Sequence, residues 1–354
     1  MKIALLVPAP IDFSPGQRFR LELYLGLKEA QGYQFAMKPF FSKKTWSILH
    51  LNNHVSNKTI GIITGFLKRF LFLFTAYQYD YIYIYREAAV IGPPVFEWLL
   101  AKLLRKKIIF DFDDSIWVST ASEANPKAAI IKCTWKIKYI CRWSHIVSVG
   151  NHFLANYASQ YCKDVRVLPT VVDTQATHNQ LKEQSKLPLT IGWTGTFTNF
   201  VQLDIIIPAI KKLSLGHDFT FLIIADKDPF YKEINYVYKK WNLNTEIEDL
   251  LLINIGVMPL HNTVLEMGKC AFKAIQYMSL GIPPVLSEVG ANKDLVTDGV
   301  DGYFASTEQE WCDKLALLLK SNDLRVAMGQ KARSRIIDQY SVESAKNGFF
   351  SLFG

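Results

Sequence analysis

Short apolar runs alternate with longer amphipathic segments along most of the chain. Apolar runs bounded by Gly, Pro, Asn or Asp are typical of buried parallel strands, and apolar residues recurring every three to four positions are typical of helices. Strand-like runs cover 2–7, 32–39, 80–85, 107–112, 144–149 and 165–169, and then 189–195, 219–225, 250–257 and 285–287. Helical patterns cover 18–30, 60–79, 95–104, 127–143, 152–161, 203–213, 230–241, 271–280 and 308–319. This alternation predicts parallel sheets joined by helical crossovers, an α/β fold.

The chain is long enough for two domains. Its 354 residues exceed what one ordinary core organises, and 49% hydrophobic against 20% charged residues describes a globular protein. We expect a first Rossmann-like domain over 1–173 and a second over 188–340, facing each other across a cleft. The tail 341–354 is expected to form a helix that crosses back to the first domain. The polar, lysine-rich segment 174–188 is the expected linker.

Charge is unevenly distributed between these halves. Residues 1–170 hold 22 Lys and Arg against 11 Asp and Glu, a net charge of +11, and the remainder holds 18 against 21, a net charge of −3. A basic domain suits an anionic partner, and because no nucleic-acid-binding motif is present, the sequence favours an anionic membrane surface over nucleic acid. The basic amphipathic segment 127–143 is the expected membrane- or acceptor-facing helix. For 60–79, a packed helix is favoured over one lying at a membrane interface.

The compartment is predicted from cysteines and hydropathy. Five scattered cysteines without metal-ligand spacing are typical of reduced thiols in a cytoplasmic protein. The opening MKIALLVPAP has a short apolar run broken by two prolines, which favours a first strand over a signal peptide. No apolar run reaches the roughly 18 residues expected of a membrane-spanning helix.

Residues 264–290, VLEMGKCAFKAIQYMSLGIPPVLSEVG, combine the features of an anion site. A loop over 265–270 is expected to lead into the helix 271–280, which ends at Gly281. Lys269 precedes the helix and Lys273 lies one turn on. Free N–H groups and the macrodipole at a helix N-terminus favour an anion, and two lysines beside it predict a phosphate site. A core-facing helix with two solvated lysines is the alternative.

The motif GKCAFKAIQYMSLGIPPVLSEVG, followed by LVTDGVDGYF, resembles the donor-binding segment of the family-four retaining glycosyltransferases (glycosyl transferases group 1), which have the GT-B fold. Their pattern carries two glutamates; here the second aligns with Gln276, and the first with Gly268, two positions after Glu266. The resemblance implies that the amides of Ala271 and Phe272 bind the donor diphosphate. It further implies that Gln276 meets the ribose and that Glu266 reaches the donor sugar.

Other strand ends supply further candidates. FDFDDSIW places Asp111, Asp113 and Asp114 at the end of the strand 107–112 and resembles the acceptor side of a branch of the family. The competing interpretation, an Asp-x-Asp metal site holding a sugar-nucleotide diphosphate, is the less favoured, and we expect no metal. In SPGQRFR and WTGT, the pairs Gly16 with Arg18 and Gly195 with Thr196 follow strands, where open α/β sheets bind ligands. They are assigned to the donor phosphates.

These observations and the resemblance together predict an enzyme. It would move a sugar from a nucleotide-sugar donor, a substrate rather than a cofactor, to a glycan or lipid-linked acceptor, with retention and without a metal. Lys269 and Lys273 would stabilise the diphosphate, and Asp113 and Asp114 would orient the acceptor. The expected setting is polysaccharide biosynthesis on the inner face of the membrane. A sugar-nucleotide 2-epimerase and a catalytically silent nucleotide- or partner-binding subunit are the alternatives.

Overall fold

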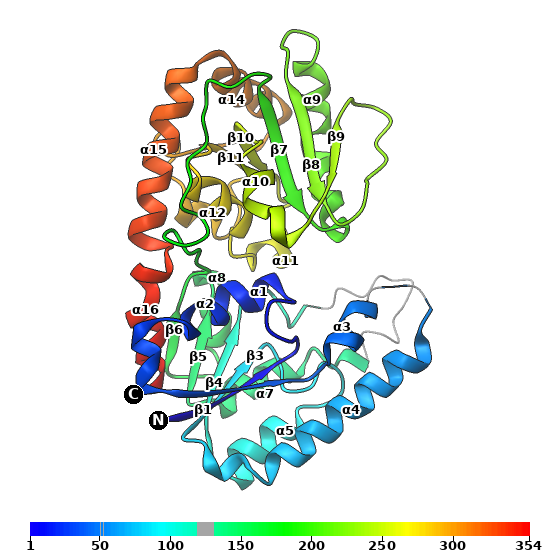
Figure 1. The fold of residues 1–354 in the computed structure, drawn as a ribbon, viewed down its shortest axis with the longest axis vertical. Helices are drawn as coiled ribbons and strands as arrows, with labels where there is room; N and C mark the ends of the chain where they lie inside the picture. The colour runs from blue at the N-terminus through cyan, green and yellow to red at the C-terminus, as the bar shows by residue number, and fades with distance from the viewer. Residues whose placement is uncertain (50, 52, 119–130) are drawn as a thin grey trace. The chain divides into compact units, whose positions relative to one another are not determined.

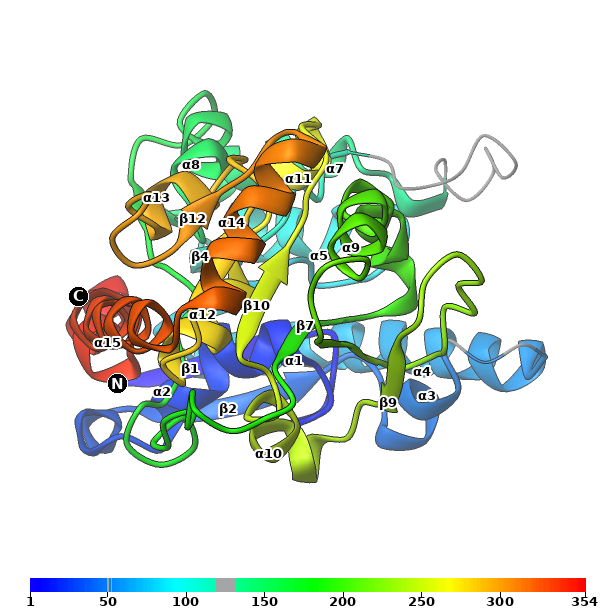
Figure 2. The same ribbon diagram turned by 90° about the horizontal axis from the view of Figure 1, so that it is seen from above.

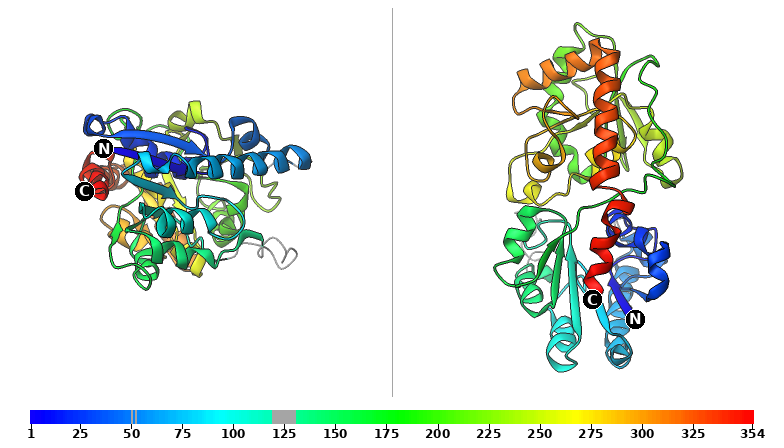
Figure 3. Two further views of the ribbon diagram at one scale, coloured as in Figure 1. Left: turned by 90° about the horizontal axis from the view of Figure 1, so that it is seen from below. Right: turned by 90° about the vertical axis from the view of Figure 1, so that its left-hand side faces the viewer.

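The computed structural model describes residues 1–49, 51, 53–118 and 131–354. The chain divides into two compact units, each with its own parallel sheet (Figure 1). The first unit comprises 1–170 and 346–354, and the second comprises 171–345. The last residues of the chain therefore return to the first unit, where Met1 contacts Gly354 and the two termini lie side by side (Figure 3).

Both sheets have six parallel strands, which confirms the predicted α/β class. Strands β1 and β3 are buried along nearly their whole length, which explains why their sequences are unbroken apolar runs. The order in the first sheet is β2 (Gln34–Pro39), β1 (Lys2–Val7), β3 (Tyr81–Tyr85), β4 (Lys107–Phe112), β5 (Ile146–Val149), β6 (Val165–Val167). The order in the second is β12 (Tyr303–Phe304), β11 (Pro284–Leu286), β10 (Ile255–Met258), β7 (Thr190–Gly195), β8 (Thr220–Ala225), β9 (Val237–Lys240).

Helices of the first unit cover its sheet in short pieces. The predicted helix 18–30 is interrupted: a π-helical turn at Arg18–Glu22 joins two short α-helices, and a 3-10 turn at Lys28–Gly32 follows. Of the predicted helix 127–143, residues 127–130 lie outside the described residues. The α-helices are α1 (Pro15–Gln17), α2 (Leu23–Leu25), α3 (Lys43–Ile48), α4 (Val55–Leu73), α5 (Val95–Trp98), α7 (Lys136–Trp143), α8 (His152–Ala158) and α16 (Val342–Phe350).

In the second unit, the helix expected over 230–241 is wrong. That segment contains β9, which pairs with β8 as an edge strand and half-buries Tyr238. The alternation of Val237, Tyr238 and Lys239 has the period of a strand, and sheet pairing overrides the helical pattern. The helices are α9 (Ile207–Leu213), α10 (Glu246–Leu250), α11 (Val264–Met267), α12 (Phe272–Ser279), α13 (Asn292–Leu295), α14 (Glu308–Lys320) and α15 (Asn322–Gln339).

The expected linker 174–188 is not a detached connection. It packs on the second unit, because its polar groups bond to backbone carbonyls there. Lys182 Nζ donates to Leu251 O at 2.8 Å, and Gln184 Nε2 donates to Asn254 O at 3.2 Å and Gly281 O at 3.3 Å. The polar composition of 174–188 therefore did not indicate that its side chains form hydrogen bonds with backbone carbonyls of the second unit.

Tyr277 fixes α12 on the second sheet. Its ring lies against the backbone of Gly256 on β10, where a Cβ would come within 2.3 Å of the ring. The Tyr277 hydroxyl accepts a hydrogen bond from Thr194 N on β7 at 2.9 Å. One residue thus ties α12 to two neighbouring strands and places its first turn near the end of β7.

Helix α15 packs closely on the end of α12 (Figure 2). The contact is backbone to backbone: a Cβ at Gly329 would lie 2.1 Å from the carbonyl oxygen of Gly281. Gly281 has a φ of +69°, the left-handed conformation that ends α12.

Substituting Gly329→Ala is expected to destabilise the second unit by about 1–3 kcal/mol, because a rigid backbone cannot yield to the added methyl group. Alanine inside a helix is otherwise favoured over glycine by about 1 kcal/mol. Gly26→Ala is the control, since Gly26 has open space at its Cβ position. Thermal unfolding should show a lower midpoint only for the Gly329 variant, and an unchanged or raised midpoint would contradict the close packing.

Candidate functional site

Each sheet has a point where its connections diverge. In the first sheet the chain leaves β1 toward β2 and leaves β3 toward β4, and in the second it runs outward through β8 and returns to β10 on the other side of β7. Ligands of open α/β sheets bind at the carboxyl ends of strands beside such points. The residues singled out in the sequence follow these strands.

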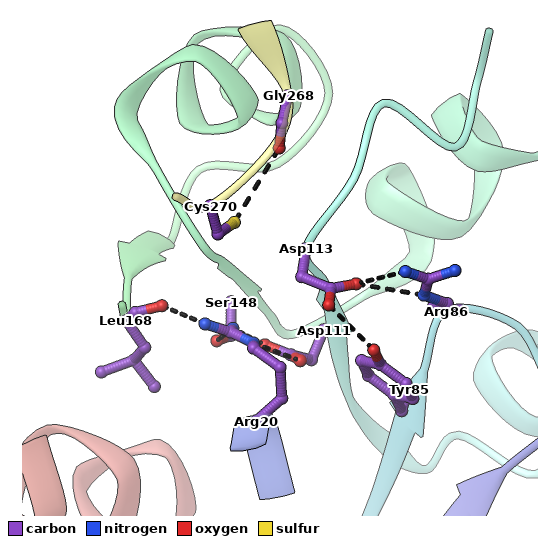
Figure 4. A network of polar contacts seen from close by, with 9 residues as sticks. All are labelled: Arg20, Tyr85, Arg86, Asp111, Asp113, Ser148, Leu168, Gly268 and Cys270. Atoms are coloured by element: carbon purple, nitrogen blue, oxygen red, sulfur yellow. Dashed lines mark hydrogen bonds and ion pairs between the residues drawn. The ribbon is translucent and has the colours of Figure 1, made fainter. Parts of the chain in front are cut away.

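In the first unit, Gly16, Tyr85 and Asp113 meet at the end of β3 and β4. The Tyr85 hydroxyl donates to Asp113 Oδ2 at 3.0 Å (Figure 4). A Cβ at Gly16 would lie 2.6 Å from that hydroxyl and 3.0 Å from Asp113 Oδ2, so only glycine lets the loop approach this closely. Sequence reasoning selected Gly16 and Asp113 for separate roles; within this unit the structure brings them together.

Arg86 holds both acidic residues that follow β4. Its Nε and Nη2 donate to Asp113 Oδ1 at 3.0 and 2.9 Å, and Nη2 also pairs with Asp114. Arg86 has a φ of +64°, a costly conformation for a residue with a side chain. Burial by itself raises the pKa of Asp113, but the charges of Arg86 and Arg20 and the bonds from Arg86 and Tyr85 hold it below its ordinary value. Asp113 is therefore a carboxylate in this structure.

Asp111 is separated from the other two carboxylates. It is fully buried and ion-paired with Arg20, whose Nη2 also donates to Ser148 Oγ at 3.3 Å and whose Nη1 donates to the carbonyl of Leu168 (Figure 4). Arg20 is itself buried. Within the described residues, no three His, Cys, Asp or Glu side chains form a group that could hold a metal ion.

In the second unit, Lys273 lies at the end of β7. Its Nζ is 5.4 Å from the centre of the Trp193 ring, and a Cβ at Gly195 would lie 2.9 Å from Lys273 Cε. Gly195 thus makes room for the lysine stem, and the Trp193 face attracts its charge. Gly195 and Lys273, which the sequence analysis selected separately, therefore lie side by side.

Lys269 is placed by a chain of amides and hydroxyls. Its Nζ donates to Asn199 Oδ1 at 2.8 Å, and Asn199 Nδ2 donates to Thr196 Oγ1 at 2.9 Å. Asn199 belongs to the 3-10 segment Phe197–Ile205 that follows β7. Lys269 Nζ is also 3.8 Å from Glu266 Oε1. Lys269 is therefore partly neutralised but still directed toward the end of β7.

Glu266 is buried rather than displayed on a loop. It lies on the short helix α11, which corrects the loop expected over 265–270. Gln202 Nε2 donates to its Oε1 at 2.8 Å, and Thr263 donates to its Oε2. Gln202 Oε1 in turn accepts from His261 N at 2.8 Å. Glu266 is thus an anchored carboxylate, held in place by Gln202 and Thr263, which no sequence pattern had singled out.

The helix start at α12 has an unusual backbone. Ala271, its N-cap, has a φ of +54°, and the first-turn amides of Ala271 and Phe272 have no carbonyl earlier in the helix to bond. Gln276 is buried on the same helix, and its Nε2 has no hydrogen-bond partner within the part of the chain that the structure describes. A buried donor without a partner is costly unless a ligand supplies an acceptor.

Several residues of these clusters escaped sequence reasoning. Asn199 and Gln202 are uncharged amides that belong to no recognisable motif, and Tyr277 has the pattern of an ordinary apolar helix position. Arg86 had a signal, because it directly follows a buried strand. Arg18, assigned to the donor phosphates, is half-buried, with its guanidinium 4.4 Å above the Phe19 ring.

Comparison with known proteins gives the class. Residues 178–335 match the family model of the glycosyl transferases group 1, and this range contains α11, α12 and the end of β7. No curated protein matches the chain significantly. Among solved structures, HepE from Anabaena in complex with UDP-glucose has a TM-score of 0.69 at 14% identity, covering 99% of both chains. Sucrose-phosphate synthase from Thermosynechococcus elongatus has a TM-score of 0.67 at 14% identity, covering 100% of this chain and 98% of the other.

These findings confirm a GT-B glycosyltransferase fold. The second unit carries a domain that matches the glycosyl transferases group 1 family over 178–335, and the whole chain has the fold of GT-B glycosyltransferases.

Replacing Arg20 by Met is expected to cost about 3–5 kcal/mol, because it leaves the buried Asp111 carboxylate without its partner. Lys293→Met is the control: its pair with Glu288 is 3.9 Å long and both side chains are exposed, so the loss should stay below about 1 kcal/mol. Chemical denaturation measures both. The double variant Arg20→Met/Asp111→Leu should recover much of the loss. If Arg20→Met cost no more stability than the control Lys293→Met, the buried ion pair would be refuted.

Proposed function

We propose that the protein transfers a sugar from a nucleotide-sugar donor to a glycan or lipid-linked acceptor with retention of anomeric configuration. One observation carries the proposal: Lys269, Lys273 and the first turn of α12 gather at the end of β7, within the segment that matches the glycosyltransferase family. Two cations and a helix N-terminus beside a strand end suit a diphosphate.

Different residues of the second unit bind different parts of the donor. Lys269, Lys273 and the amides of Ala271 and Phe272 bind the diphosphate, with Gly195 and Thr196 shaping its floor. Gln276 Nε2, buried without a partner among the described residues, donates to a ribose oxygen. Glu266 accepts from a hydroxyl of the donor sugar or, anchored as it is by Gln202, holds Lys269 in position.

In the first unit, Asp113 and Asp114 are assigned to orienting the acceptor hydroxyl, and Gly16 and Arg18 are assigned to binding donor phosphate. In the reaction, the bond from the anomeric carbon to the diphosphate oxygen breaks and a bond to the acceptor oxygen forms on the same face. The diphosphate keeps the bonding electron pair. Rate enhancement then comes from orientation and from cations that stabilise this leaving group, a role that needs no metal in the proposed scheme.

The setting follows from the acceptor. We infer a role in polysaccharide biosynthesis, at the cytoplasmic face of an anionic membrane, where a lipid-linked acceptor would be exposed. No helix among residues 1–49, 51, 53–118 and 131–354 is long and apolar enough to cross a membrane.

The experiment that tests the proposal is thermal stabilisation by a panel of nucleoside diphosphates and their sugars, with and without EDTA. UDP and UDP-glucose come first, because a structural neighbour is described with them. Stabilisation by one nucleotide, unchanged by EDTA, supports a metal-independent donor site. No shift with any nucleotide would overturn the proposal, and a shift abolished by EDTA would overturn its metal independence.

Lys273→Ala is expected to lower transfer by about 10²-fold or more, because the leaving diphosphate loses a charge contact. The control is Lys293→Ala, an exposed lysine of the same unit. The rate is measured as release of nucleoside diphosphate from the donor in the presence of acceptor. Near-normal turnover by a folded Lys273 variant would remove the phosphate role.

Asp113→Asn should reduce transfer while leaving the affinity for nucleotide unchanged, because Asp113 belongs to the first unit and the nucleotide is assigned to the second. Calorimetric titration with the nucleotide that stabilises the wild type measures the affinity. Lost nucleotide binding in a folded variant would contradict this division of roles. Conversion of the donor without release of nucleotide, in either enzyme, would favour the 2-epimerase alternative.

A further inference from the structure

Helix α4 of the first unit presents its large apolar side chains to solvent. Five of them, together with Phe74 directly after the helix, form what we name the α4 stripe, with exposed fractions between 52% and 64%: Ile60, Ile63, Leu67, Phe70, Leu71 and Phe74. At 3.6 residues per turn these positions fall within an arc of roughly 100°. Solitary exposed apolar residues are ordinary, but a contiguous stripe along a helix marks an interaction surface.

The opposite face of α4 explains why the stripe points outward. The helix packs on its unit through small residues: a Cβ at Gly65 would lie 2.4 Å from the Phe40 ring, and one at Gly61 would lie 2.2 Å from Thr45 Cγ2. The buried Arg69 donates to three backbone carbonyls, Ala88 O at 2.6 Å, Lys38 O at 2.9 Å and Val7 O at 3.0 Å. The stripe is therefore not a core face left open; the core face of α4 is the glycine face.

A cationic pocket adjoins the stripe between α3 and α4. Its volume is about 210 Å³, and it is lined by Ile60 of the stripe together with polar groups and two lysines. Lys44 comes from α3 and Lys68 from α4, with Ser42, Asn57 and Thr64 between them. Two ammonium groups with hydroxyl and amide donors suit the phosphate of a lipid headgroup, and the apolar stripe beside them suits acyl chains.

The same side of the first unit continues in aromatic residues. Helix α4 contacts α5, and α5 contacts α7 (Figure 1). A hollow of about 270 Å³ is lined by apolar and aromatic side chains of α5 and α7, among them Trp98, Trp135 and Tyr139. Tryptophan and tyrosine are the side chains that membrane interfaces favour.

Charge selects a lipid surface over a second copy of the chain. Residues 30–79, which contain α3 and α4, include no Asp or Glu and six Lys and Arg. An isologous pair of α4 stripes would bring the lysines of both copies together with no carboxylate of this segment to offset them. An anionic bilayer complements the same surface.

We propose that the α4 stripe lies in the interface of an anionic membrane, with Lys44 and Lys68 binding headgroup phosphates. This inference rests on the peripheral attachment proposed above and names its surface. It replaces the segment 127–143 as the principal contact, because Lys136 of α7 is buried, pairs with Glu87 and donates to Ala89 O at 3.0 Å. Helix α4, expected to be simply a packed helix, has both a packed face and an interfacial face.

The test is flotation of the full chain with vesicles at low salt, one set of pure phosphatidylcholine and one of equal parts phosphatidylcholine and phosphatidylglycerol. Wild type should float with the anionic vesicles at least about tenfold more than with the neutral ones. Ile63→Glu/Phe70→Glu should lower anionic-vesicle binding about tenfold or more, because the charges would be buried in lipid. Leu187→Glu/Leu215→Glu, at exposed positions of the second unit, is the matched control and should float as wild type does.

Lys44→Ala/Lys68→Ala should remove most of the preference for anionic lipid. The inference is overturned if wild type does not float, if the stripe variant floats as wild type does, or if light scattering shows that the stripe variant converts a dimer to a monomer. Thermal stabilisation by nucleotides, measured without vesicles, distinguishes the membrane proposal from the transferase proposal. A stripe variant that is stabilised normally by nucleotide but no longer floats supports the membrane surface. Wild-type protein that floats but binds no nucleotide would overturn the transferase proposal without contradicting the membrane proposal.

Discussion

The contact of Tyr277 with Gly256 and Thr194 determines how α12 and its lysine are placed on the second sheet. The ring lies directly on the β10 backbone, which only glycine permits, and the hydroxyl accepts from the β7 amide at 2.9 Å. Burial raises the pKa of Tyr277 well above its ordinary value, so the hydroxyl stays neutral. Because α12 cannot slide or rotate past this point, Lys273 is held against Trp193 and Gly195, and the helix start faces the end of β7.

The first unit uses its arginines differently. Arg20 and Arg69 are buried, as is Lys136, and each donates to backbone carbonyls inside the unit. Part of the basic excess in the first 170 residues is thus structural and adds nothing to the surface. Of the basic residues that remain, five lysines lie in residues 30–79 with α3 and α4, a segment that contains no Asp or Glu. Counting charges along a sequence overstates the surface field, and burial shows where that field lies.

Helix α4 shows how a correct pattern leads to an incomplete interpretation. Its amphipathic sequence is real, but the usual assumption that large apolar residues face the core fails. The helix approaches its unit through Gly61 and Gly65, since only glycine allows Phe40 and Thr45 to come so close. Close approach through small residues leaves the large ones outside. Hydropathy alone therefore does not show which face of such a helix packs against the core.

The sequence by itself determined the α/β class and the positions of nearly all strands along the chain, and it singled out 264–290 as a candidate anion site, because these depend on local periodicity and on residues adjacent in the chain. Only the tertiary structure decided the rest. The edge strand β9 lies where a helix was expected, and Asn199 and Gln202 bond to Lys269 and Glu266. The aspartates at the end of β4 pair with different arginines, Asp111 with Arg20 and Asp113 with Arg86. Gln202 and Glu266 lie 64 residues apart in the sequence, and Arg20 and Asp111 lie 91 residues apart. Pairing over those distances is fixed by the packing of strands and helices, which no local pattern encodes.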